Sequence, residues 1–131
     1  MTAYPFRPVQ LSDEVLCVQV TPVAEGAVAL TVTGEVDVLS APVLQRALDA
    51  VWDGDPRHVT VDLRGVTFLN APGLRLLHDA RQAAAARRVR LDVQTRPGRV
   101  ARLLHSVGLG GTTDGSVVGA PEQPCAAART A

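Results

Sequence analysis

Several residue types are scarce or missing in this chain of 131 residues, and each absence excludes a class of protein. Lysine is absent and all 13 basic residues are arginine, which is typical of a high-GC bacterial genome. Aromatic residues make up only 3%, which leaves little for nucleic-acid bases to stack on. No apolar run reaches the length of about 18 residues that spans a membrane, and residues 1–8 hold no signal-peptide core. We therefore expect a cytoplasmic protein with neither a nucleic-acid nor a membrane partner.

Cysteine and histidine are also few, and none has the spacing of a metal site. Cys17 and Cys125 lie far apart and form no Cys-x-x-Cys pair, which is typical of reduced thiols in a cytoplasm. His58, His78 and His105 have no ligand spacing either. The chain also lacks a nucleophile elbow, a phosphate-binding loop and a dinucleotide fingerprint. We therefore expect no metal, no cofactor and no enzymatic activity.

What the chain does contain is the composition of one folded domain. Apolar residues make up 47% and charged residues 20%, which is ordinary for a globular protein, and the length suits a single core. The formal net charge is zero. Arginines are dense between Arg81 and Arg102, but we expect helix ends and strand flanks to scatter them over a solvated surface.

Hydrophobic periodicity predicts strands that alternate with helices. Four short segments alternate apolar and polar residues, as half-buried strands do: 16–20, 28–32, 59–63 and 89–93. A turn at 22–26 joins the first two in a hairpin. Amphipathic helices are predicted after Ser40, whose hydroxyl suits a cap, after Asn70, and after Gly98. Gly108 is predicted to end the last helix in a left-handed conformation.

This order of elements predicts the fold class and the boundaries of the domain. Strands that alternate with helices require parallel neighbours joined by right-handed crossovers, so we expect an α/β fold. Residues 13–109 are predicted to form the domain and residues 1–12 an N-terminal extension. Residues 110–131, rich in Gly, Ala and Pro, are predicted to be a partly disordered tail.

Three stretches, in order and correctly spaced, resemble one known family. They are Gly34-Glu35-Val36-Asp37 followed by Ala41-Pro42, then Val61-Asp62-Leu63-Arg64-Gly65-Val66-Thr67-Phe68-Leu69, then Gly73-Leu74. Together they resemble STAS domains, which include bacterial anti-sigma-factor antagonists and the cytoplasmic tails of sulfate transporters. The resemblance covers roughly residues 13–109. It implies a STAS-like mixed sheet of four to five strands, an N-terminal hairpin and then parallel neighbours, covered by three or more helices mainly on one face.

The junction at residues 70–74 departs from the antagonist pattern. In the antagonists this stretch is usually Asp-Ser-Ser-Gly-Leu, and a partner kinase phosphorylates the second serine. Here it is Asn70-Ala71-Pro72-Gly73-Leu74, so Pro72 stands where the resemblance places the phosphoacceptor. Proline has no hydroxyl, and we expect no phosphorylation there. Thr67 and Ser40 are weak substitute candidates, because Thr67 suits a strand end and Ser40 a helix cap.

Two interpretations of this junction remain open. In the first, Glu35, Asp37 and residues 70–74 are the partner-binding surface of a non-enzymatic interaction domain. The resemblance then implies an antagonist that binds an anti-sigma factor, kinase-type or otherwise, or a related regulator, and influences transcription without a phosphorylation switch. In the second, Asn70, Ala71 and Pro72 only begin a helix, and any binding surface lies elsewhere.

The two loop carboxylates and the function class also have alternatives. The resemblance favours partner contact for Asp37, whereas Glu35 suits a solvated loop charge. Two carboxylates near a helix start can also act as an acid–base pair. The alternative function is a STAS-type small-molecule or lipid-binding module, or a scaffold unrelated to sigma-factor control.

Overall fold

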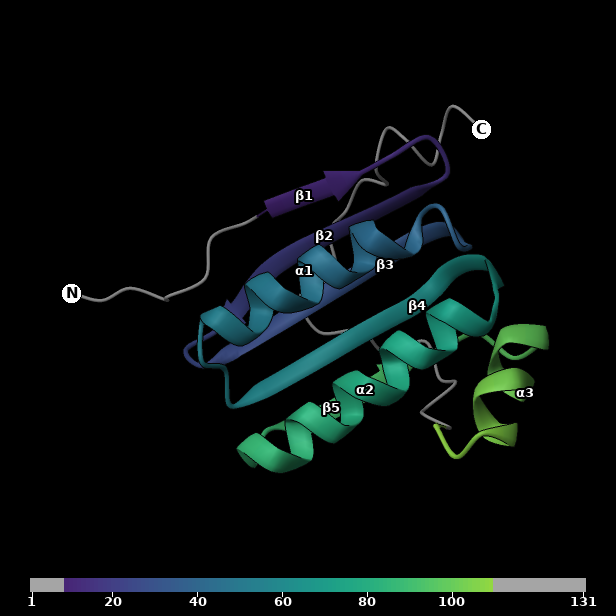
Figure 1. Ribbon diagram of the computed structural model, residues 1–131. Coiled ribbons are helices and arrows are strands. Elements are labelled where there is room, and N and C mark those ends of the chain that lie inside the picture. The colour runs from purple at the N-terminus through teal and green to yellow at the C-terminus, as the bar shows by residue number, and fades with distance from the viewer. Residues whose placement is uncertain (1–8, 110–131) are drawn as a thin grey trace.

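Five strands form one mixed sheet in the computed structural model, which describes residues 9–109 (Figure 1). The strands are β1 (Val9–Ser12), β2 (Leu16–Ala24), β3 (Ala27–Val36), β4 (His58–Leu69) and β5 (Arg90–Gln94), and they lie in chain order across the sheet. β1, β2 and β3 pair antiparallel, whereas β3, β4 and β5 pair parallel. The predicted α/β fold, with a hairpin followed by parallel neighbours, is confirmed.

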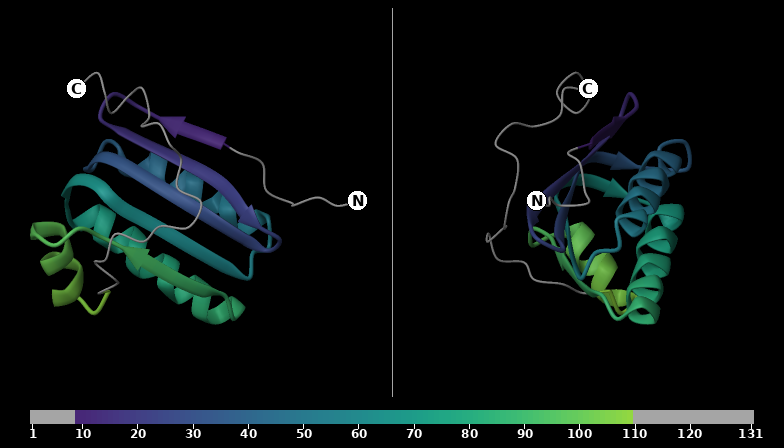
Figure 2. Two further views of the ribbon diagram at one scale, coloured as in Figure 1. Left: turned by 180° about the vertical axis from the view of Figure 1, so that it is seen from behind. Right: turned by 90° about the vertical axis from the view of Figure 1, so that its left-hand side faces the viewer.

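Three helices accompany this sheet: α1 (Ala41–Asp53), α2 (Ala71–Arg87) and α3 (Arg99–Ser106). Figures 1 and 2 show α1 and α2 side by side on one face of the sheet, and α3 packs against β4. The prediction of helices mainly on one face is therefore confirmed. Within residues 9–109 none of the helices is long and apolar enough to cross a membrane.

The hydrophobic core lies between the sheet and α1 and α2. Alternate strand residues are buried in it: Leu16, Val18, Val20, Val28, Leu30, Val32, Val59, Val61 and Leu63. The helices contribute Leu44, Ala47, Leu48, Val51, Leu77 and Ala80 to the same cluster. At the far end of the helices the Arg87 guanidinium lies 5.1 Å from the centroid of the Trp52 ring and joins α2 to α1. The predicted apolar faces of both helices are confirmed, except that Leu74 is only partly buried.

The predicted end of α3 is also confirmed. Gly108 has a φ of 79°, and the N–H of Leu109 donates to the carbonyl of Leu104 at 2.8 Å. This is a Schellman motif, in which a left-handed glycine lets the chain satisfy the last helix carbonyls.

The structure corrects the prediction at three places. Residues 9–12, which we assigned to an extension, form β1 and pair with β2. Pro22, predicted to lie in a turn, belongs to β2 and sits beside a bulge. Cys17 is buried and disulfide-bonded, so the predicted reduced thiol is wrong there, because sequence spacing does not show which residues meet in space. Cys125 and the predicted tail lie outside the described residues.

Candidate functional site

The candidate site lies at the end of the sheet where β3 and β4 both finish. These strands run parallel with Val36 opposite Leu69, so the loop after β3 and the start of α2 become neighbours. The N–H of Asn70 donates to the carbonyl of Val36 at 3.1 Å and closes this contact. The structure therefore brings together the two segments that the sequence marked as candidates.

Asp37 organises the loop between β3 and α1. Its Oδ1 accepts hydrogen bonds from the N–H of Ser40 at 2.8 Å and from the N–H of Leu39 at 3.0 Å. Hydrogen bonds to the carboxylate hold the pKa of Asp37 below its ordinary value of 3.8. The bond from the Ser40 N–H is the largest cause, and the bond from the Ser40 hydroxyl is the next. The carboxylate therefore stabilises the loop to which it belongs, a role that the sequence analysis did not assign to it.

Ser40 precedes α1 as predicted, but its hydroxyl does not cap the helix. The hydroxyl instead accepts from the N–H of Asp37 at 2.9 Å, and it can donate either to the carbonyl of Glu35 at 2.9 Å or to the Oδ1 of Asp37 at 3.0 Å. The predicted cap is wrong because these partners precede the helix. Ser40 is 0% exposed, which also weighs against it as a phosphoacceptor.

The folded loop displays apolar side chains that the sequence analysis did not single out. Val38 is 66% exposed and Leu39 is 82% exposed, and Phe68 at the end of β4 is 48% exposed. A signal was present in the sequence, since Val38 and Leu39 stand between two polar residues in a short loop. Val38 and Leu39 are neighbours in one loop, and exposed apolar residues that lie together mark a surface for another molecule.

Asn70 connects this loop to the start of α2. Its side chain caps the helix as predicted, with Oδ1 accepting from the N–H of Gly73 at 3.4 Å. The opposite amide orientation satisfies two loop groups: Nδ2 donates to the carbonyl of Val36 at 3.1 Å, and Oδ1 accepts from the N–H of Val38 at 3.3 Å. This orientation replaces the bond from Gly73, and an aspartate, which has no side-chain donor, could not make the bond to the Val36 carbonyl.

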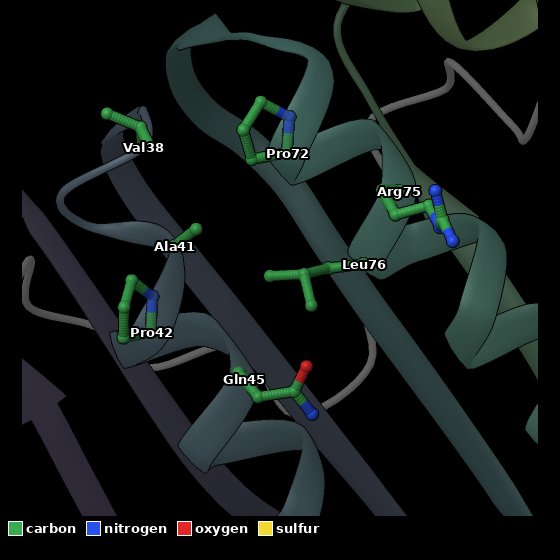
Figure 3. A pocket seen from close by; sticks show the side chains of 7 residues that line it. All are labelled: Val38, Ala41, Pro42, Gln45, Pro72, Arg75 and Leu76. Atoms are coloured by element: carbon green, nitrogen blue, oxygen red, sulfur yellow. The ribbon is translucent and has the colours of Figure 1, made fainter.

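An open groove of about 380 Å³ separates the first turns of α1 and α2. Its lining residues are Val38, Ala41, Pro42, Gln45, Pro72, Arg75 and Leu76. Figure 3 shows Leu76 extending from α2 towards α1, with Val38 and Pro72 near the mouth, whereas Arg75 points away from the gap. The lining of the groove is mainly apolar. Neither helix has an acidic residue in its first turn.

The other predicted site residues are not part of the groove lining, and they differ in exposure. Glu35 and Ala71 are exposed, and Gly73 is buried. Leu74 faces partly into the core. Thr67 is exposed, and its hydroxyl donates to the carbonyl of Gly34 at 3.3 Å. In the described part of the chain, no three Asp, Glu, His or Cys side chains are grouped so as to hold a metal ion.

The family model described as "Mlab, STAS domain" matches residues 21–119 of the chain. The chain belongs to the STAS domain family. The anti-sigma-F factor antagonist RsfB of Mycobacterium tuberculosis is 31% identical to it over 84 residues, which are 64% of this chain and 68% of the relative. The family model and the curated relative therefore both agree with the resemblance to STAS domains that the three sequence motifs indicated.

Solved structures share the STAS fold. An anti-sigma factor antagonist from Mycobacterium paratuberculosis has a TM-score of 0.67 and 27% identity, over 76% of this chain and 83% of its own. The anti-sigma factor antagonist SpoIIAA in its unphosphorylated form has a TM-score of 0.62 and 18% identity, over 71% of this chain and 82% of its own. At that identity the second likeness shows the fold alone.

Proposed function

We propose that this STAS domain is a non-enzymatic binding protein that acts on an anti-sigma factor or a related regulator and so influences transcription. The observation that carries the proposal is the docking surface, which we define as Val38, Leu39 and the groove between α1 and α2. The names of RsfB and of the Mycobacterium paratuberculosis protein as anti-sigma factor antagonists support the same partner class.

The shape of the docking surface favours a protein partner over a small ligand. The groove is open, and the exposed side chains of Val38 and Leu39 stand beside it rather than enclosing a cavity. Small-molecule sites are concave and bury most of their ligand, whereas the centres of protein interfaces are apolar and shielded by a polar rim. Glu35 and the free oxygen of Asp37 supply acceptors at such a rim for an arginine of the partner.

The proposed binding cannot be switched by phosphorylation at position 72. In the family pattern, a phosphorylated serine adds about −1.5 to −2 charge to the docking region and opposes binding. Pro72 lies in the first turn of α2 beside the groove and carries no hydroxyl. Its fixed φ suits a first helical turn, so the shape of the helix start is kept while the modification site is lost.

The location of the docking surface can be tested by calorimetric titration of the full chain with candidate anti-sigma factors. We expect Leu39→Asp to weaken binding at least about tenfold, because a buried unpaired carboxylate opposes an apolar contact. Val107→Asp is the control, since Val107 is also an exposed apolar residue but lies after α3. Equal weakening by Val107→Asp would place the interface elsewhere.

The absence of a switch has a separate test by intact-protein mass spectrometry. After incubation with a kinase-type anti-sigma factor and ATP, we expect the mass of the wild-type chain to stay unchanged. The double variant Ala71→Ser with Pro72→Ser is expected to gain a phosphate and then to release the partner. Stoichiometric phosphate on the wild-type chain would contradict constitutive binding and would direct attention to Thr67.

A further inference from the structure

A second cavity, of about 220 Å³, lies between the end of β4 and the turn that leads from β5 into α3. None of its lining residues belongs to the docking surface. Arg64 and Thr67 line it from β4, and Arg96, Gly98 and Arg99 line it from the turn and from α3. The sequence analysis expected these arginines to be scattered over a solvated surface, but the fold gathers three of them around one hollow.

The balance of charge around this cavity is positive. Asp62 is the acidic partner of Arg64, with the Arg64 Nε 3.1 Å from the Asp62 Oδ1. Arg96 and Arg99 are exposed, and the ion pairs within residues 9–109 all involve other side chains. Among residues 9–109, no acidic side chain pairs with these two guanidinium groups, and each offers paired donors that match a phosphoryl group.

The start of α3 adds backbone donors to the same cavity. No side chain caps this helix, and its first turn contains no acidic residue. The first N–H groups of a helix lack partners within the helix, and its N-terminal end carries partial positive charge. Gly98 leaves open space where a side chain would stand, so an anion can approach the backbone closely.

We propose that this cavity binds a phosphoryl group, either as free phosphate or as a monoester carried on a side chain. Arg96 and Arg99 donate hydrogen bonds to its oxygens, and the backbone N–H groups at the start of α3 contribute neutral donors. The cavity is smaller than the roughly 300–1,000 Å³ of pockets for drug-sized ligands, so the phosphoryl group carries little else into it. This site does not depend on the partner proposed above.

The probe for this site is inorganic phosphate, titrated into the ¹⁵N-labelled full chain and followed by amide chemical shifts. We expect saturable shifts at Thr67, Gly98 and Arg99, and about a tenfold or greater loss of affinity in the variant Arg96→Gln with Arg99→Gln. The double variant Arg46→Gln with Arg102→Gln is the matched control, because it removes the same two charges at exposed positions outside the lining. We expect it to bind phosphate like the wild type.

A second titration, with a tripeptide that has phosphoserine between two glycines, distinguishes the source of the phosphoryl group. Much tighter binding of the peptide than of phosphate would identify a phosphorylated side chain as the occupant, and equal binding would identify the free anion. The proposal is overturned if neither probe moves the cavity amides. It is also overturned if the control variant Arg46→Gln with Arg102→Gln loses as much affinity as Arg96→Gln with Arg99→Gln, since binding would then follow net charge alone.

Discussion

Gly73 lies buried in the first turn of α2, where the helix packs on the ends of β3 and β4. A Cβ at this position would stand 2.5 Å from Leu69 Cδ1 and 2.7 Å from Val36 Cγ1. The glycine of the motif is therefore explained by close packing and not by an unusual backbone angle. It lets α2 begin directly beside the loop that displays Val38 and Leu39.

We predict that Gly73→Ala destabilises the domain by about 1–2 kcal/mol. Alanine would gain about 0.5–1 kcal/mol as the better helix former, but overpacking of a filled core costs about 1–3 kcal/mol. The measurement is the free energy of unfolding in urea. A variant as stable as the wild type would show that the side chains of Leu69 and Val36 yield without cost.

The ionisation of Asp37 makes the stability of the folded domain depend on pH. Its pKa is lower in the folded protein than the ordinary value of 3.8, so its contribution to stability is present above about that pH. The contribution is lost as the pH falls through the folded pKa, because the protonated carboxyl no longer accepts the same hydrogen bonds.

We predict that Asp37→Asn lowers the free energy of unfolding at neutral pH, and that the gap to the wild type narrows as the pH falls below about 3.8. Urea unfolding of both proteins over a pH series measures this gap. A gap of constant size over the whole series would mean that the charge on Asp37 does not support the loop.

At the scale of secondary-structure elements, α2 ends at a non-glycine residue in the left-handed conformation, which residues with a side chain disfavour. Arg88 has a φ of 58°, and the N–H of Val89 donates to the carbonyl of Ala84 at 2.8 Å, as in a Schellman motif. The equivalent position after α3 is Gly108, which adopts the left-handed region without strain. The end of α3 could therefore be predicted from its glycine, whereas the end of α2 carries no such signal.

We predict that Arg88→Gly stabilises the domain by up to about 1 kcal/mol, because the left-handed conformation costs a non-glycine residue about 1–2 kcal/mol. The thermal midpoint measures the change. Gln82→Gly is the matched control at an exposed position inside α2, and we expect it to destabilise by about 0.5–1 kcal/mol. Two variants that shift the midpoint in the same direction would contradict the backbone argument.

At the scale of the whole molecule, β1 extends the sheet to residues that precede the predicted domain boundary at residue 13. β1 pairs with β2 along one edge of the sheet, and Leu11 packs against the core. The sequence analysis missed this strand because four residues are too few for a clear alternation. A chain that began at residue 13 would expose the backbone edge of β2, which invites pairing with another chain.

We predict that a variant comprising residues 13–131 loses about 1–2 kcal/mol of stability and associates at high concentration. Leu11 is only partly buried, and full burial of a leucine is worth about 1.5–3 kcal/mol. Urea unfolding and light scattering measure the two effects. A variant comprising residues 9–131 is the control that retains β1, and equal loss in both would show that the edge strand is not the cause.

The sequence by itself determined the α/β class and most of the candidate site. Alternation in the strands, apolar faces on the helices and the capping residue Asn70 are local features, and local rules predict them. The family motif located residues 70–74, and the lack of a hydroxyl at Pro72 needs no structure to be recognised. Each of these properties depends on residues that are close together in the chain.

Only the tertiary structure decided which side chains share a surface. The parallel pairing of β3 with β4 places the loop that carries Val38 and Leu39 beside the start of α2, although some thirty residues separate the two segments. The same folding gathers Arg64, Arg96 and Arg99 around a cavity. Strand register and helix packing set these distances, because they depend on the burial of the whole core and not on any one segment.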